Sequence, residues 1–181
     1  MTIEILKPTM YKLRNIEGGC SYALITLTDL HENAGSISID SDYGSWNYMW
    51  GSMGSDIRGF LLRTSKDYLI NKLTMNNRAD RDVFDFEKTI VEMKKAIINY
   101  RKEEYIDSEL ARKAYNEAKE LSEEYTTSHE AFYNVSQEYE SIQEVFNSDY
   151  FPCHTDYSAS IKMFMNEVFP VFKDILKKEI V

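Results

Sequence analysis

The chain has 181 residues, a hydrophobic fraction of 43% and a formal net charge of −9. This length fits one medium domain, and the apolar content excludes a wholly disordered chain. No run of about 18 apolar residues is present, which excludes a membrane-spanning helix, and the first residues lack the pattern of a signal peptide. We therefore expect a cytoplasmic protein with no membrane partner; the oligomeric state is not predicted.

The first part of the chain is predicted to form a small antiparallel sheet. Residues 2–16 sustain no single period. After the Gly18-Gly19 turn, residues 22–28 are rich in β-forming side chains and apolar on both faces. A loop at 31–35 leads to residues 36–42, where polar and apolar side chains alternate as in a strand with one wet face. The short connections favour a meander.

The next strand carries both tryptophans, within residues 42–54. At the two-residue period of a strand, Trp46, Tyr48 and Trp50 share one face. This aromatic face has to be covered, so these three residues are predicted to anchor the core.

After Gly54 the apolar period becomes that of helices. Two short helices are predicted around residues 57–61 and 69–73, with Ser52 or Ser55 capping the first and Thr64-Ser65 the second. A polar linker at 76–82 precedes three longer helices, with the second beginning near Asp107-Ser108 and the third, uninterrupted to Phe146, near Ser128. A last helix spans about 158–178, with Pro170 kinking it.

These elements predict an α+β fold, in which a small antiparallel β-meander is covered by helices and followed by a C-terminal helical region. We expect residues 1–75 to form the meander with two short helices. Residues 76–181 form a helical region packed on it, within one compact domain.

Negative charge is concentrated in residues 103–149, which hold thirteen acidic and three basic side chains, a net −10. Direct nucleic-acid binding through this segment is disfavoured, because phosphates require Lys and Arg. The acidic face could instead meet a basic partner surface that normally holds nucleic acid. The alternative is a solvated helical face. The glutamates assigned to partner binding are Glu117, Glu120, Glu123 and Glu124.

Asp40 and Asp42 are two residues apart near a strand end, so their carboxylates share one face and could hold a divalent cation. Asp29 and His31 in the neighbouring loop are possible further ligands. No phosphate-binding loop accompanies them. We therefore predict no resident metal or cofactor, and keep a metal-dependent enzyme as an alternative.

The cysteines offer no catalytic pattern. Cys20 and Cys153 are far apart and are expected to be reduced thiols, with a disulfide as the alternative. Cys153 and His154 are sequence neighbours, whereas a nucleophile and its base usually come from separate parts of a chain. We expect no catalytic residue.

The aromatic strand has a second reading, as a platform on which nucleic-acid bases stack. Such a platform needs interleaved positive charge, and the strand itself contains none. A modest basic patch could come from Arg58, Arg63, Lys66 and Lys72. A nucleic-acid-associated protein therefore remains an alternative.

The segment Asp42-Tyr-Gly-Ser-Trp-Asn-Tyr-Met-Trp-Gly-Ser-Met-Gly54, followed by Phe60-Leu61-Leu62 and by residues 67–73, resembles a family of small phage and prophage accessory proteins. That family is similar in its pattern G-x-W-x-Y-x-W, then F-L, then D-Y-x-x-x-K-L, over roughly residues 20–75. The resemblance implies a non-enzymatic phage inhibitor of a host defence system. More finely, it implies an anti-CRISPR protein that binds an RNA-guided nuclease in the bacterial cytoplasm. No functional residue carries over from the family.

Overall fold

The computed structural model describes residues 3–146 and 151–180, and it confirms the predicted α+β class. The chain divides into two compact units. Unit 1 comprises Met1–Arg81 and Tyr157–Val181, and unit 2 comprises Asp82–Asp156. Unit 2 is thus inserted into the sequence of unit 1, and the C-terminal helix belongs with the sheet. This grouping differs from a division at residue 75.

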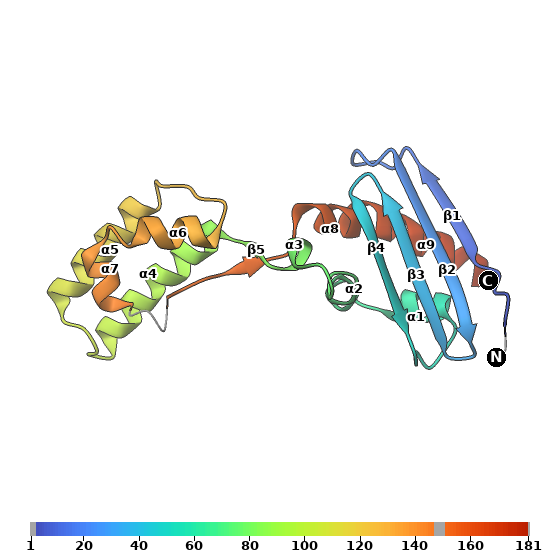
Figure 1. The fold of residues 1–181 in the computed structure, drawn as a ribbon, viewed down its shortest axis with the longest axis horizontal. Coiled ribbons are helices and arrows are strands. Elements are labelled where there is room, and N and C mark those ends of the chain that lie inside the picture. Colours follow the sequence, from blue (N-terminus) through green and yellow to red (C-terminus); the bar gives the residue numbers. More distant parts are fainter. Residues whose placement is uncertain (1–2, 147–150, 181) are drawn as a thin grey trace. The chain divides into compact units, whose positions relative to one another are not determined.

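Unit 1 is built on a four-stranded antiparallel meander in the order β1-β2-β3-β4 (Figure 1). The predicted meander is confirmed, with an additional first strand that pairs with β2 along its whole length. Pro8 lies just before that strand, where its missing amide donor costs no ladder hydrogen bond. The strands are β1 (Thr9–Arg14), β2 (Tyr22–His31), β3 (Ala34–Ser41) and β4 (Gly44–Trp50).

One face of this sheet is buried and the other is open to solvent. The register aligns Tyr11, Ile25, Ile39 and Trp46 across the four strands, and all four side chains are buried. Trp50 is 5% exposed on the same face. The intervening residues of β3 and β4 point to the open side and are mostly serine, asparagine and aspartate, as an uncovered antiparallel face requires.

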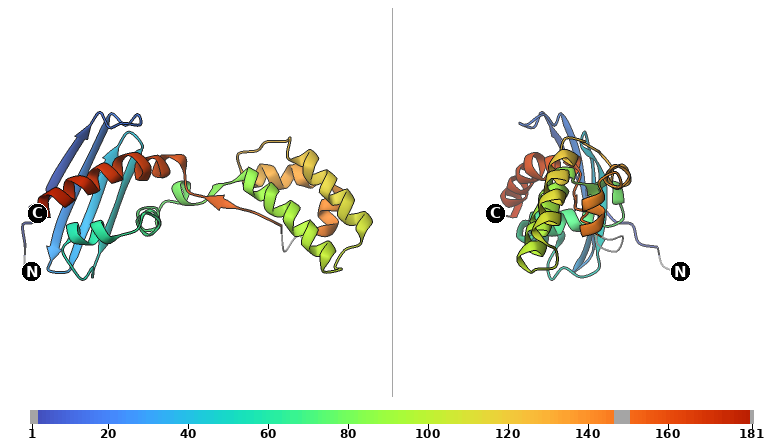
Figure 2. Two further views of the ribbon diagram at one scale, coloured as in Figure 1. Left: turned by 180° about the vertical axis from the view of Figure 1, so that it is seen from behind. Right: turned by 90° about the vertical axis from the view of Figure 1, so that its left-hand side faces the viewer.

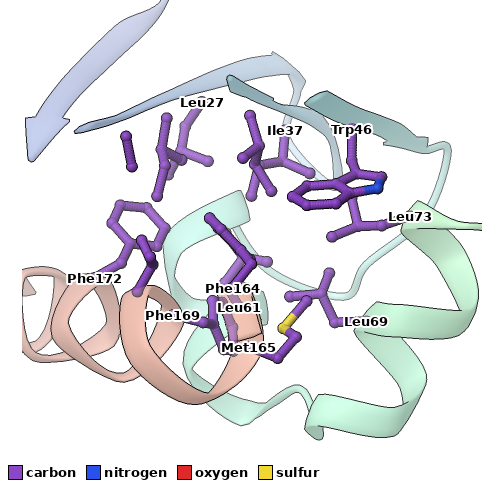
Figure 3. Close-up of a cluster of buried hydrophobic side chains, with 14 of the residues drawn as sticks. Leu27, Ile37, Trp46, Leu61, Leu69, Leu73, Phe164, Met165, Phe169 and Phe172 are labelled. Atoms are coloured by element: carbon purple, nitrogen blue, oxygen red, sulfur yellow. The ribbon is translucent and has the colours of Figure 1, made fainter. Parts of the chain in front are cut away.

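Helices from both ends of the sequence cover the buried face. Figure 3 shows Trp46 and Ile37 of the sheet facing side chains that include Leu69 of α2 and Phe164 of the C-terminal helix. The left panel of Figure 2, which views the protein from behind, shows this helix running along the sheet. The elements are α1 (Ile57–Arg63), α2 (Lys66–Leu73), α3 (Arg78–Arg81), α8 (Ala159–Met163), the π-helical turn η1 (Phe164–Val168) and α9 (Phe169–Ile180).

Two helix starts can be compared with the predicted caps. The predicted cap of α1 is wrong. The capping residue is Asp56, whose carboxylate accepts a hydrogen bond of 2.7 Å from Gly59 N, and neither of the two serines fills this role. The cap of α2 is Ser65, as predicted.

The C-terminal helix contains a wider turn where a kink was predicted. Phe169 N donates to Phe164 O, five residues back, and Pro170 follows at once. Proline supplies no amide hydrogen, so an α-helical bond is missing directly after this π turn.

Unit 2 is a helical layer closed by a two-stranded ribbon (Figure 1). Its elements are β5 (Val83–Phe84), α4 (Phe86–Lys102), α5 (Ser108–Leu121), α6 (His129–Ser136), α7 (Glu140–Val145) and β6 (Thr155–Asp156). Asp107 and Ser128 cap α5 and α6, as their positions in the sequence predict.

The predicted third long helix is wrong as a continuous element. It ends at Ser136, whose hydroxyl donates to Tyr133 O, and α7 begins only at Glu140. Gln143 Nε2 donates to Ser136 O, so side chains take over the hydrogen bonds that a continuous helix would make. The break turns α7 back against α5.

Candidate functional site

The glutamates assigned to partner binding lie on α5 and the turn after it. Glu117 and Glu120 belong to α5, and Glu123 and Glu124 follow its last residue. Glu120, Glu123 and Glu124 are exposed, whereas Glu117 is half-buried. Three of the four carboxylates therefore stand at exposed positions.

Tyr139 marks the point where carboxylates from different elements converge. Burial raises the pKa of its hydroxyl first, and the negative charges of Glu124, Glu120, Glu138 and Glu117 raise it further. These acids come from α5, from the turn after it and from the segment before α7. Sequence separation hides this convergence, because it depends on the turn between α6 and α7.

A hollow of about 580 Å³ lies between α5 and α7 and is also acidic. Glu117 lines it as well, so this carboxylate belongs both to the hollow and to the group around Tyr139. Lys113 is the basic residue in its lining, and it is paired with Glu109 at 3.0 Å, a contact that raises the pKa of Lys113. We call this the acidic surface; it comprises Asp107, Glu109, Glu117, Glu120, Glu124, Glu138, Glu140 and Glu144.

Glu117 also has a structural role that its sequence position does not reveal. Its Oε2 accepts a hydrogen bond of 2.9 Å from Ile142 N, in the first turn of α7. The residue before α7, Tyr139, offers no side-chain cap to that helix. Glu117 therefore supplies the acceptor that a capping residue would otherwise provide.

Formal charge is divided unequally between the units. Residues 82–156 carry eighteen acidic and eight basic side chains, a net −10, while the rest of the chain carries twelve and thirteen, a net +1. The excess charge of the protein thus resides in unit 2.

The carboxylates considered for a metal have protein partners. Asp42 Oδ2 accepts hydrogen bonds from Ser21 N, Ser21 Oγ and Tyr22 N, and these bonds, chiefly that from the serine hydroxyl, lower the pKa of Asp42. Asp40 Oδ1 accepts one from Ser45 Oγ at 2.7 Å. Within residues 3–146 and 151–180 there is no group of three or more side chains able to hold a metal ion.

Asp29 and His31 do not join them. They lie at the end of β2, whereas Asp42 is bonded to residues at the start of that strand. Asp29 instead accepts from Ile57 N and pairs with Arg58 at 3.2 Å. The hypothesis that Asp29 and His31 join Asp40 and Asp42 as ligands of one cation is therefore wrong, because the two pairs lie at opposite ends of β2.

The cysteines are free thiols in different surroundings. Cys20 is buried in the core of unit 1. Cys153, His154 and Glu92 line a hollow of about 320 Å³ in unit 2. Cys153 is exposed, and partial desolvation by its neighbours raises the pKa of its thiol, so no residue that the structure describes activates it as a thiolate.

The tryptophans are not available for stacking on bases. Trp46 and Trp50 are 3% and 5% exposed, and Tyr48 packs against the same core. The basic residues near them have other partners: Arg58 bonds to Asp29, Arg63 to Ser55, Lys66 to Asn166, and Lys72 lies over the rings of Tyr48 and Tyr68.

Comparison with known proteins gives the family. A model described as a phage family matches residues 1–178. No curated protein and no solved structure matches the chain. Because the family model covers nearly the whole sequence, the chain belongs to this phage family.

Among the residues described, no helix has the length and apolar character needed to span a membrane.

Proposed function

We propose that this member of a phage family is a non-enzymatic inhibitor that binds a host defence protein through its acidic surface. The target is a basic surface that normally holds nucleic acid, and the specific class proposed is an RNA-guided nuclease, which makes the protein an anti-CRISPR. The observation that carries the proposal is the gathering of eight carboxylates, from α5, its flanking residues, the segment before α7 and α7 itself, around a hollow and around Tyr139 within one compact unit.

The charge distribution supports binding to a basic protein. Unit 2 has a net charge of −10 and unit 1 of +1, so an approaching basic surface is drawn to unit 2. At physiological salt this attraction extends over about 8 Å, and it speeds association more than it strengthens the final complex. Repulsion of phosphates by the same surface argues against nucleic acid as its direct ligand.

Unit 2 has a hydrophobic core that can hold a binding surface in place. Its buried side chains form a core of their own, which includes Phe86, Met93, Phe132 and Ile142. The acids therefore stand on a scaffold that can present them without help from unit 1. A fixed array of carboxylates on helices is a suitable counterpart for lysines and arginines that hold a phosphate backbone.

The test is binding to single-protein RNA-guided nucleases, each offered free, loaded with guide RNA, and loaded with guide and target DNA. We expect binding that is lost once DNA occupies the basic channel, and inhibition of DNA cleavage when the protein is added first. The association rate should fall as salt rises.

Two variants with the same change of net charge give the control. Glu120→Gln, Glu123→Gln and Glu124→Gln together remove three exposed charges at the end of α5, two of them from the acidic surface, and should slow association by about tenfold. Glu4→Gln, Glu17→Gln and Glu32→Gln remove the same charge from exposed positions of unit 1 and should leave the rate nearly unchanged. Equal rates for the two variants would show that the acidic surface is only a solvated face. Absence of binding to every nuclease would refute the proposed target class.

A further inference from the structure

A groove between α4 and α5 carries the opposite charge to the rest of unit 2. It has a volume of about 310 Å³ and an almost wholly apolar lining. Its floor is formed by Ile97 and Ala111, which are buried, and its walls by Ile98 and Tyr115, which are 42% and 39% exposed. Arg101, Lys102 and Arg112 stand at its rim, together with Asn116.

The groove arises from small residues on α5. Ala111, Ala114 and Ala118 lie on the buried face of this helix, which allows α4 to pack closely. At Ala111 a larger side chain would fill the space over Ile97, and alanine leaves it open. The apolar floor is therefore a consequence of how the two helices pack.

Among the residues that the structure describes, the basic side chains of the rim have no ion-pair or hydrogen-bond partner. Of the eight basic residues of unit 2, three gather here, and all three are exposed. No ion pair or side-chain hydrogen bond of Arg101, Lys102 or Arg112 exists within the part of the chain that the structure describes. By contrast, Lys95 and Lys113 are paired with glutamates of their own helices.

We propose that this groove is a docking site for an acidic amphipathic helix of a partner protein. Apolar side chains one turn apart would enter the groove, and carboxylates beside them would meet the rim. The lining residues of α4 extend over about 8 Å, which matches a contact of one to two helical turns. This site is separate from the acidic surface and does not depend on the proposed inhibition.

Charge complementarity favours this occupant over two others. A second copy that presents the same groove would bring six cations together. A nucleic acid has no apolar side chains for the floor, and its phosphates would face the net −10 of unit 2. A helix with a few carboxylates can pair directly with the rim cations, while acids farther than about 8 Å from it are largely screened by salt.

The probe is a labelled synthetic helix of about four turns with leucines on one face and glutamates flanking them. Its counterpart has lysines in place of the glutamates. Both are titrated into the full chain by fluorescence anisotropy. The overall charge of −9 favours the lysine peptide, so tighter saturable binding of the glutamate peptide would support the local rim. Equal or tighter binding of the lysine peptide, or no saturable binding of the glutamate peptide, would overturn the proposal.

Matched variants locate the binding. Arg101→Gln, Lys102→Gln and Arg112→Gln together should weaken the glutamate peptide by about tenfold, since each exposed charge pair contributes a factor of about two to three. Lys88→Gln, Lys95→Gln and Lys113→Gln change the net charge equally at positions outside the groove lining, and should change binding by less than about twofold. Ile98→Ser removes an exposed apolar wall without changing charge and should also weaken binding. Equal effects of the two triple variants, or no effect of Ile98→Ser, would refute this site.

Discussion

Replacing Trp46 by phenylalanine separates two contributions to the stability of unit 1. The indole is 3% exposed and packs on Phe164 with ring centroids 5.4 Å apart, and its Nε1 donates a 2.8 Å hydrogen bond to Asp80 Oδ2. Phenylalanine keeps a ring, removes the donor and leaves a small void. The hydrogen bond to a charged group is worth about 1.5–3 kcal/mol and the void about 1 kcal/mol. The free energy of unfolding should therefore fall by about 2.5–4 kcal/mol, and for Trp46→Ala by about 5 kcal/mol.

Trp50→Phe is the matched control. Trp50 is 5% exposed, but its Nε1 donates to the neutral hydroxyl of Tyr68 at the longer distance of 3.2 Å. A neutral bond and the same void predict a loss of about 1.5–2.5 kcal/mol. Both tryptophans belong to unit 1, so each phenylalanine variant keeps one fluorophore for urea titration. Equal losses for the two variants, or a loss below about 1 kcal/mol for Trp46→Phe, would refute the reasoning.

Three further predictions concern unit 1. Deleting residues 83–155 and joining the ends with a short glycine-serine linker should leave the unit folded, because Ser158 N donates to Asp80 O at 2.8 Å and holds the ends together; loss of cooperative unfolding by tryptophan fluorescence would contradict this. Asp42→Asn should destabilise unit 1 at neutral pH. Hydrogen bonds, chiefly from the Ser21 hydroxyl, hold the pKa of Asp42 below 3.8, so its contribution is present above the unfolded pKa and is lost as pH falls through the folded pKa. A difference in urea midpoints that did not shrink in acid would contradict that cause. Saturating magnesium or manganese should leave the thermal midpoint unchanged, and a rise that Asp40→Asn abolishes would favour the metal-enzyme alternative.

The sheet could be predicted because its signals are local. Alternation at residues 36–42 and the aromatic positions 46, 48 and 50 define faces at a period of two, and the turns between them are short. β1 lacks such a signal in isolation: Tyr11 and Leu13 are buried on one face, but residues 2–16 sustain no single apolar period. Its place depends on pairing with β2, which is a property of the folded chain.

The division of the chain into units depends on long-range packing. The stripe Phe164, Val168 and Phe172 in the C-terminal helix is as amphipathic as those of α4 and α5. Nothing in the pattern says that it faces the sheet instead of the other helices. In unit 1 Phe164 packs against Trp46, and Val168 and Phe172 belong to the same core, whose sheet residues come more than a hundred positions earlier. Figure 3 shows Phe164 and Phe172 facing the sheet.

The candidate site was predictable in charge and not in geometry. The excess of acids after residue 103 is a matter of counting. Their gathering around Tyr139 requires the break between α6 and α7, which the continuous stripe from Phe132 to Phe146 conceals. The groove depends on Ala111, a residue whose small size has meaning only once α4 lies beside it.

Glu117 is where folding and the proposed binding overlap, and its replacement tests that overlap. Glu117→Ala removes the acceptor of Ile142 N and should lower the stability of unit 2 by about 1.5–3 kcal/mol, the range for a hydrogen bond to a charged group. Amide hydrogen exchange at Ile142 should accelerate, because no side chain of Tyr139 replaces the cap. Glu120→Ala, exposed on the same helix, should stay within about 0.5 kcal/mol of the wild type. An unchanged exchange rate at Ile142 in Glu117→Ala would mean that α7 does not need this carboxylate. Glu117 would then be a surface charge like Glu120, with no structural role.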